Sequence, residues 1–383
     1  MRTFKIGIMG SGIISRTYLS DIKTFYKSLD VIACADTDIE HSRNLASEFG
    51  IKKAYTPEEL LNDEEVEIVI NLTPPQLHVQ LGKKIVAAGK HLFSEKPFAP
   101  SLKEAKEVLD LADEKGVKVG SAPDTFLASG LQSVRYYLDA NLIGKPFFVT
   151  ANMTTFGIET WHTNPSPYYL QNGGPLYDMG PYYLSAIVSL LGPIESIASL
   201  DAKAFDTRHV YVGPNAGTDI DSEIPTHYSA ILRLVSGVVV NFNVSFDIYK
   251  SNLPMFEIYG DSGTLTYPDP NFGGGTPCIY RKEQYTDVIY QNTEEAMIRK
   301  NRFYELPEVF ARVKDYSRGL GVLDLAKAIE TNSSNRVNGN FIMHITEAIE
   351  GIMYSSKNGE FYKMITTCER PEPLKPGGYI DEV

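Results

Sequence analysis

The chain has 383 residues, of which 43% are hydrophobic and 22% are charged, and its formal net charge is −12. A chain of this length is longer than those that usually fold around a single hydrophobic core, so we predict two domains. The acidic balance argues against nucleic acid or an anionic membrane as a partner, because phosphate binding requires a basic surface. Three cysteines without paired spacing and seven scattered histidines predict neither a disulfide framework nor a metal site. With no apolar run long enough for a bilayer and no signal peptide before the first strand, we expect a cytoplasmic protein.

A glycine-rich turn follows the first expected strand, Phe4–Met9. Its sequence, Gly10-Ser11-Gly12-Ile13-Ile14-Ser15, is a dinucleotide-binding fingerprint with serine in the third glycine position. In such a turn the first glycine permits the tight bend, and the second lets the backbone approach a pyrophosphate. The third position requires a small residue for close packing of helix and strand. We therefore predict that the backbone of residues 10–14 binds a dinucleotide cofactor.

The second expected strand, Val31–Ala35, is followed directly by Asp36. At this distance from the glycine turn, a carboxylate accepts hydrogen bonds from the adenine ribose hydroxyls. The same charge would repel a 2′-phosphate, so NAD is favoured over NADP, although Arg43 on the next helix could soften that preference. The alternative role for Asp36 is a helix N-cap, which Thr37 or Asp38 could supply equally well.

Helices and strands then alternate as far as Gly120, which is typical of a doubly wound parallel sheet with a Rossmann fold. We expect this domain to span residues 1–122. After the strand that ends at Asn71, Thr73 and Pro74 lead into a helix whose unpaired N–H groups face the cofactor crevice, so both are assigned to the cofactor site. His78 on that helix is either a further cofactor contact or a structural histidine.

The strand His91–Ser94 runs directly into Glu95, Lys96 and Pro97. Ligands bind in the crevice outside the carboxyl ends of parallel strands, so Lys96 arrives where cofactor and substrate could meet it. Pro97 disfavours the helical backbone conformation for Lys96, the residue before it, and so restricts the position of that lysine. A surface Glu-Lys pair at a strand end is the alternative. The neighbouring motifs favour assigning Glu95 and Lys96 to the cofactor site.

Beyond Gly120 the alternation stops and β-rich segments dominate. Tight-turn signals at Ser236-Gly237 and Asp261-Ser262-Gly263 predict hairpins, and hence antiparallel pairing. We expect residues 123–383 to form a second α/β domain with a large, mostly antiparallel open sheet. Such a sheet leaves a face or an edge to be covered, which predicts a homodimer or a homotetramer.

Five residues of this second half are candidate substrate contacts. Asp124 follows the last Rossmann strand and is expected to line the crevice. Trp161 and His162 lie in a proline-broken aromatic loop, and flat aromatic faces beside polar donors suit a sugar or cyclitol ring. Packing of this loop over the core is a compatible alternative. Asp178 and Tyr182 are four residues apart and share one face in a helical conformation.

The order of these motifs, continued by the distant segment from Gly173 to Gly180, resembles the glucose–fructose oxidoreductase/inositol dehydrogenase/rhizopine catabolism (Gfo/Idh/MocA) family over essentially the whole chain. The resemblance implies a Rossmann domain followed by an α/β domain with a large sheet, and an NAD(P)-dependent dehydrogenase acting on CH–OH groups. It further implies that Lys96 reaches the nicotinamide ribose and the reacting hydroxyl, and that Asp178 contacts the substrate. Many members carry a catalytic histidine where this chain has Tyr182, as some sugar-oxidising members do.

We therefore expect the oxidation of a secondary hydroxyl of a sugar, polyol or cyclitol, with Lys96, Asp178 and Tyr182 as the catalytic residues. A base takes the hydroxyl proton while hydride passes to C4 of NAD. An ammonium beside a phenol favours the phenolate, so Tyr182 is the expected proton carrier, with Tyr183 and His162 as rivals. Two other functions stay open. One is an NAD-dependent glycoside hydrolase that oxidises its substrate transiently, and the other is a non-catalytic NAD-sensing regulator.

Overall fold

The computed structural model describes residues 1–273, 275–291, 293–300, 302–310 and 317–375. The chain divides into two compact units. The first comprises Met1–Ala128, Arg312–Glu347 and Leu374–Val383, and the second comprises Ser129–Ala311 and Ala348–Pro373. The boundary expected from the sequence placed everything after residue 122 in a second domain. The compact units differ from that expectation because a later segment of the chain returns to the first unit.

A parallel sheet of six strands forms the centre of the first unit, in the order β3-β2-β1-β4-β5-β6 among the described residues. Its strands are β1 (Phe4–Met9), β2 (Leu29–Ala35), β3 (Lys53–Tyr55), β4 (Ile68–Asn71), β5 (His91–Ser94) and β6 (Val119–Ser121). Its helices are α1 (Ile13–Phe25), α2 (Ile39–Phe49), α3 (Pro57–Asn62), α4 (His78–Ala87), α5 (Leu102–Lys115) and α11 (Leu320–Glu330). The predicted doubly wound parallel sheet is confirmed.

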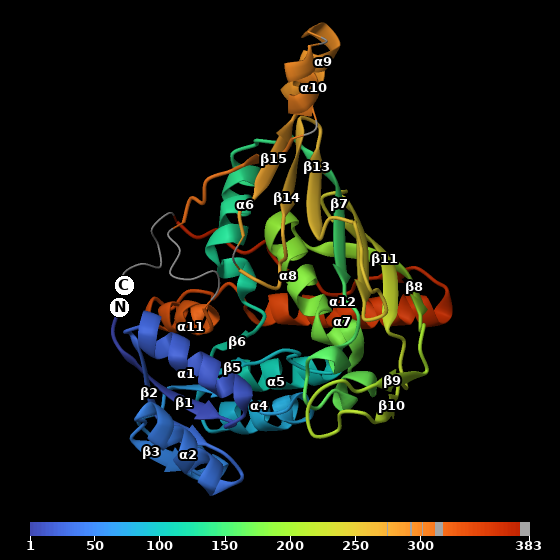
Figure 1. Cartoon of the computed structure of the whole chain (residues 1–383). Coiled ribbons are helices and arrows are strands. Elements are labelled where there is room, and N and C mark those ends of the chain that lie inside the picture. The colour runs from blue at the N-terminus through green and yellow to red at the C-terminus, as the bar shows by residue number, and fades with distance from the viewer. Residues whose placement is uncertain (274, 292, 301, 311–316, 376–383) are drawn as a thin grey trace. The chain divides into compact units, whose positions relative to one another are not determined.

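Alternate residues of β1 pack on opposite faces of this sheet. Phe4, Ile6 and Ile8 belong to a core cluster shared with α1, α2 and α11. On the other face, a Cβ added to Gly7 would meet Leu60 of α3 at 2.8 Å. Helix α11 therefore packs against the first sheet, although it comes after most strands of the second unit in the sequence (Figure 1).

A larger sheet forms the second unit, in the order β16-β15-β14-β13-β7-β12-β11-β8-β17 among the described residues. Among the pairings of its described strands, only that of β7 with β12 is parallel, so the predicted mostly antiparallel sheet is confirmed. The strands are β7 (Pro146–Thr154), β8 (Ile194–Ala202), β11 (His227–Leu234), β12 (Val239–Ser245), β13 (Phe256–Gly260), β14 (Gly263–Tyr267), β15 (Cys278–Arg281), β16 (Tyr304–Glu305) and β17 (Tyr362–Lys363). A separate pair is formed by β9 (Thr207–His209) and β10 (Asp219–Asp221). The helices are α6 (Ser129–Asp139), α7 (Gly174–Asp178), α8 (Gly180–Leu191), α9 (Lys282–Gln291) and α10 (Glu294–Lys300), together with the later part of α12 (Gly339–Asn358), which begins in the first unit.

The two faces of this larger sheet differ. Phe242 of β12 is buried toward α8, where a Cβ on Gly180 would lie 4.0 Å from its ring. On the opposite face, Leu200 of β8 is 71% exposed and Ile231 of β11 is 48% exposed. Among the described helices, none combines the length and apolar character that a bilayer crossing requires.

Candidate active site

The glycine turn after β1 packs against the backbone of a neighbouring loop. Gly10 has a φ of +102°, and a Cβ there would lie 2.8 Å from the carbonyl carbon and oxygen of Leu72, so only glycine fits. Gly12 faces open space, with no atom within 4 Å of a Cβ built on it. Ser15 is buried and its hydroxyl donates to the Gly12 carbonyl at 2.5 Å. This arrangement leaves room for a pyrophosphate at the start of α1.

Asp36 supports the glycine turn from the end of β2. Its carboxylate accepts hydrogen bonds from the backbone N–H groups of Ser11 at 2.8 Å and Asp38 at 3.1 Å, and its side chain is 19% exposed. Asp38, rather than Asp36, caps α2 by accepting from the N–H of Glu40 at 3.0 Å. Arg43 pairs with the Glu40 carboxylate at 2.5 Å on the exposed surface. The N-cap alternative for Asp36 is thus filled by Asp38.

His78 links the loops that follow β4 and β5. Its Nδ1 lies 2.8 Å from the carbonyl oxygen of Pro97, and its Nε2 lies 2.8 Å from that of Thr73. Burial lowers the pKa of this imidazole, although both carbonyls favour the charged form. A neutral ring has one N–H and donates to one of these carbonyls at a time. Of the two roles that the sequence left open, the geometry favours the structural one.

Glu95, at the end of β5, is surrounded by hydrogen-bond donors. Its carboxylate accepts from the Tyr18 hydroxyl at 2.9 Å, the Arg318 guanidinium at 2.8 Å and the backbone N–H of Lys96 at 3.0 Å. Burial would raise the pKa of this carboxyl, but the charges of Arg318 and Lys96, with these hydrogen bonds, hold it below its usual range. The alternative of a surface pair does not hold for Glu95, which is 7% exposed.

Asp124 is fully buried within the first unit. Its carboxylate accepts from the backbone N–H of Gly321 at 2.5 Å, at the start of α11. A Cβ on Gly321 would lie 2.8 Å from this carboxylate and 2.6 Å from the Phe93 ring, so the helix approaches closely only because glycine is there. This contact makes Asp124 an anchor for α11, a role that the sequence did not indicate.

Three buried hydroxyl groups at the carboxyl edge of the first sheet have no hydrogen-bond partner among the described residues. They belong to Ser11 after β1, Ser94 at the end of β5 and Thr125 after β6. Leaving a buried hydroxyl unpaired costs about 1–3 kcal/mol, so such groups indicate where a ligand or water completes a site. Together with the space at Gly12 and the Asp36 carboxylate, they fit a dinucleotide lying along this edge.

In the second unit, the segment with Asp178 and Tyr182 forms two helices. Pro175 lies in the first turn of α7, which ends at Asp178, and Pro181 lies in the first turn of α8. The face expected to be shared by Asp178 and Tyr182 in one helix is therefore interrupted at Met179. Asp178 is half-buried and Tyr182 is 4% exposed.

The two rival proton carriers are engaged elsewhere in the second unit. The Tyr183 hydroxyl donates to Asp269 at 2.9 Å, and burial together with that carboxylate raises the pKa of Tyr183 far above its usual value. Nδ1 of His162 accepts from the backbone N–H of Asn164 at 3.1 Å. In the neutral ring the other nitrogen then carries the proton, which leaves no unshared lone pair for a base.

A buried arginine anchors the aromatic loop that carries Trp161 and His162. The Arg208 guanidinium donates to Glu159 at 3.3 Å and pairs with Asp247 at the end of the sheet, and both Arg208 and Glu159 are almost fully buried. Trp161, only two residues beyond Glu159, is 64% exposed. The loop is therefore fixed at its base while its indole faces outward, which differs from packing over the core. Three rings lie near the guanidinium: Phe156, Tyr169 and Phe205.

Comparison with known proteins assigns both units. A profile described as "Oxidoreductase family, NAD-binding Rossmann fold" matches residues 4–122, and one described as "GFO/IDH/MocA C-terminal domain" matches residues 131–266. The chain belongs to the Gfo/Idh/MocA oxidoreductase family. The first unit is therefore an NAD-binding Rossmann domain.

Several known proteins are similar to this chain over much of its length. An uncharacterized protein of Saccharomyces cerevisiae is 29% identical over 70% of this chain and 74% of its own length. The 1,5-anhydro-D-fructose reductase of Ensifer adhaerens is 26% identical over 68% of this chain and 74% of its own length. Across four curated relatives the match spans between 54% and 74% of the relative. A levoglucosan dehydrogenase in complex with NADH and L-sorbose superposes with a TM-score of 0.77 at 15% identity, over 96% of this chain and 100% of that chain, which supports the fold.

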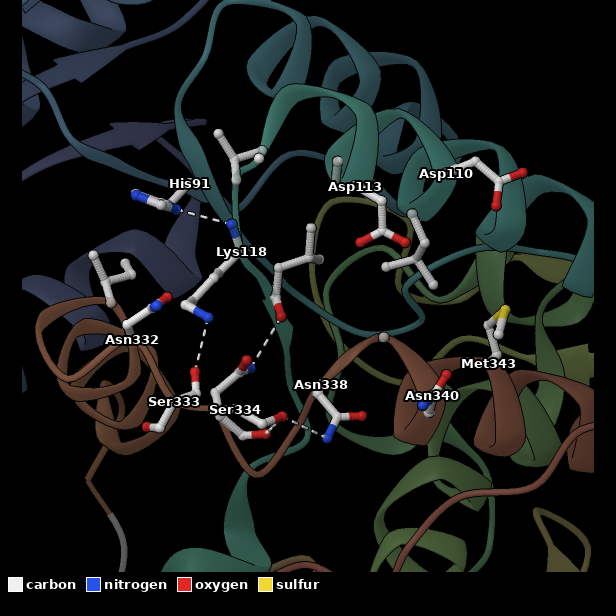
Figure 2. A pocket seen from close by; sticks show the side chains of 18 of the residues that line it. His91, Asp110, Asp113, Lys118, Asn332, Ser333, Ser334, Asn338, Asn340 and Met343 are labelled. Atoms are coloured by element: carbon white, nitrogen blue, oxygen red, sulfur yellow. Dashed lines mark hydrogen bonds between the residues drawn. The ribbon is translucent and has the colours of Figure 1, made fainter.

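Figure 2 shows a separate hollow in the Rossmann unit, at the amino ends of β5 and β6. It has a volume of about 790 Å³ and lies between α5, the start of α12 and the residues 332–338. His91, at the start of β5, accepts from the backbone N–H of Lys118 at 2.9 Å, and the Lys118 ammonium donates to the Ser333 carbonyl at 2.8 Å. Dinucleotides bind at the carboxyl ends of such strands, so this hollow lies at the opposite edge from the cofactor site.

Proposed function

We propose that this Gfo/Idh/MocA oxidoreductase oxidises a secondary hydroxyl of a sugar, polyol or cyclitol, with NAD as the hydride acceptor. The observation that carries the proposal is the junction after β5, where buried Glu95 fixes the backbone from which Lys96 extends. This junction lies at the sheet edge that carries the glycine turn. The names of two similar proteins, 1,5-anhydro-D-fructose reductase and levoglucosan dehydrogenase, support a sugar-type substrate.

For the cofactor we propose NAD rather than NADP. Asp36 places a carboxylate 2.8 Å from the N–H of Ser11, where an adenine ribose would donate to it and a 2′-phosphate would be repelled. Arg43, the cation that could offset this repulsion, pairs with Glu40. Bound NAD would supply the hydride-accepting carbon.

Residues of the protein would remove the proton of the reacting hydroxyl and orient the substrate. We assign Lys96 to the reacting hydroxyl, Asp178 to substrate binding and Tyr182 to the proton. The hydrogen bond from Tyr183 to Asp269 and the acceptor role of His162 Nδ1 support Tyr182 over these two rivals. The exposed Trp161 offers a flat face for a sugar ring.

A panel of aldoses, polyols, cyclitols and glycosides, each incubated with the protein and NAD, tests this function. We expect formation of NADH with at least one free sugar, polyol or cyclitol. Aglycone release with only catalytic amounts of NAD would instead indicate the glycoside hydrolase. Tight NAD binding without turnover of any compound would indicate the regulator.

A further inference from the structure

Two segments of the second unit contact one another along the aromatic loop. One is the loop around Trp161, and the other is the stretch that follows β9. The backbone N–H of Tyr211 donates to the Glu159 carbonyl at 3.0 Å. A Cβ built on Gly213 would lie 2.8 Å from Cα of Thr163, so only glycine permits this approach. Trp161 lies in the sequence between these two points of contact.

Each of the two segments presents an exposed aromatic ring with an imidazole beside it. Trp161 is 64% exposed, and its ring centre lies 5.4 Å from that of His162 in an edge-to-face contact. Tyr211 is 56% exposed, and its ring centre lies 5.2 Å from that of His209 in the same kind of contact. Val210, between the members of the second pair, is completely buried, so this pair faces away from the core. Aromatic rings gathered on a surface indicate a binding site.

The two imidazoles offer opposite hydrogen-bonding groups to a ligand. Nδ1 of His162 accepts from the backbone N–H of Asn164 at 3.1 Å, so in the neutral ring Nε2 carries the proton and can donate. Nδ1 of His209 lies 2.7 Å from a carboxylate oxygen of Asp219 and donates to it, which makes Nε2 of the neutral ring an acceptor. A hydroxyl group both donates and accepts, so it can bind at either imidazole.

A buried cluster connects the bases of the two segments. Arg208, which precedes His209 in β9, donates to Glu159 of the aromatic loop at 3.3 Å, and both side chains are almost fully buried. The same guanidinium pairs with Asp247. Because both segments are fixed to one cluster, little conformational freedom would be lost when a ligand lies across them.

We propose that Tyr211 and His209 form a second sugar-ring site beside Trp161 and His162, so that the sugar bound best has two linked rings. This rests on the proposed function, the oxidation of a sugar-type hydroxyl. A sugar ring has an apolar face of C–H groups and an edge of hydroxyl groups. An aromatic face with a polar group next to it complements both features, and the two segments provide this combination twice.

The chain contains a single tryptophan, Trp161, so its fluorescence reports directly on this surface. The probes are glucose with its disaccharides maltose and cellobiose, and galactose with lactose and melibiose, each titrated with and without NAD. We expect at least one disaccharide to bind about tenfold more tightly than its monosaccharide, the effect of covering one more apolar ring face. If no disaccharide binds more tightly than its monosaccharide, the second ring site is wrong.

Variants of Tyr211 test which ring supplies the difference. Tyr211→Ala should lower the affinity for the disaccharide, relative to its monosaccharide, by about tenfold. Tyr211→Phe keeps the aromatic face and should retain most of the parental ratio. Phe361→Ala is the matched control, because Phe361 is 80% exposed but precedes β17, and it should leave both affinities unchanged. An unchanged ratio in Tyr211→Ala would refute the proposal. A smaller mass of this variant in light scattering would then assign the ring to a contact with a second copy.

These binding measurements do not depend on turnover. The expected binding by a protein that forms no NADH with any saccharide would keep the second ring site and reject the proposed oxidation. Formation of NADH with monosaccharides, together with an unchanged affinity ratio in Tyr211→Ala, would keep the proposed oxidation and reject the second ring site.

Discussion

At the scale of single residues, the prediction of the preferred cofactor depends on Asp36. Its carboxylate is oriented by two backbone N–H groups, so a 2′-phosphate would meet a fixed negative charge. We expect NAD to be used at least tenfold better than NADP, a difference of about 1.4 kcal/mol. Asp36→Ser should narrow this ratio in kcat/KM, whereas Asp38→Ser, at the cap of α2, should leave it as it is. Equal efficiency of the parent with both cofactors would contradict the assignment.

Tyr182 and its neighbour offer a matched pair of single-atom changes. Tyr182→Phe should lower turnover by ~10²–10⁴-fold, the usual contribution of general acid–base catalysis, and leave NAD binding intact. Tyr183→Phe removes only the hydrogen bond to Asp269 and should affect stability more than turnover. If Tyr182→Phe is as fast as the parent and His162→Ala is inactive, the base is His162.

A feature of the site could be predicted from the sequence only where its interacting residues lie close together along the chain. The glycine turn and Asp36 lie close together along the chain, so their spacing carries the information. The contact of Arg318 with Glu95 spans 223 residues and leaves no periodic signal. The same is true of Arg208, whose partners Glu159 and Asp247 lie on different segments. The burial of Asp124 also depends on a distant partner, Gly321.

At the scale of elements, the Arg208 cluster fixes the aromatic loop to the larger sheet. Arg208→Met would leave the carboxylates of Glu159 and Asp247 buried without their cation, which typically costs about 3–5 kcal/mol. We expect the free energy of unfolding, measured in urea, to fall by about this amount. Arg43→Met removes an ion pair on the exposed surface and should change the free energy of unfolding by less than about 1 kcal/mol. A small effect of Arg208→Met would show that the cluster is not needed to hold the loop.

Elements with strong local signals follow the sequence closely. Helix α5 spans Leu102–Lys115 between two local signals, because Ser101 caps its first turn and Gly116 adopts the left-handed conformation after its end. The turns predicted at Ser236-Gly237 and Asp261-Ser262-Gly263 connect β11 to β12 and β13 to β14. The short pair β9–β10 was missed, since three-residue strands depend on tertiary partners rather than on local preference.

At the scale of the whole molecule, the two compact units do not correspond to two continuous stretches of the sequence. A linear reading expects one boundary near residue 122, because alternation of helices and strands stops there. Helix α11 nevertheless packs with β1 and α1, and its Val322 and Leu325 are completely buried. The hydrophobic pattern of such a helix predicts a buried face but not the sheet against which it packs. The place of α11 in the first unit could therefore not be inferred from its sequence.

The exposed face of the larger sheet leads to the prediction about assembly. Leu200 and Ile231 lie on adjacent antiparallel strands, where Ile231 is opposite Ala198 and Leu200 is opposite Ser229, so all four share the face away from α8 and α12. Apolar side chains gathered on an uncovered sheet face favour association with a second copy. We therefore predict a homodimer or homotetramer joined through this face.

Light scattering at micromolar concentration measures this directly. Charges introduced into a buried interface remain unpaired, so Leu200→Glu combined with Ile231→Glu should convert the oligomer into a monomer. Val235→Glu is the matched control, because Val235 is 63% exposed but lies in the turn after β11 rather than on the open face. This control should keep the parental mass. A parent that is already monomeric would rule out the predicted assembly, and an oligomer that survives the double substitution would place the interface on another surface.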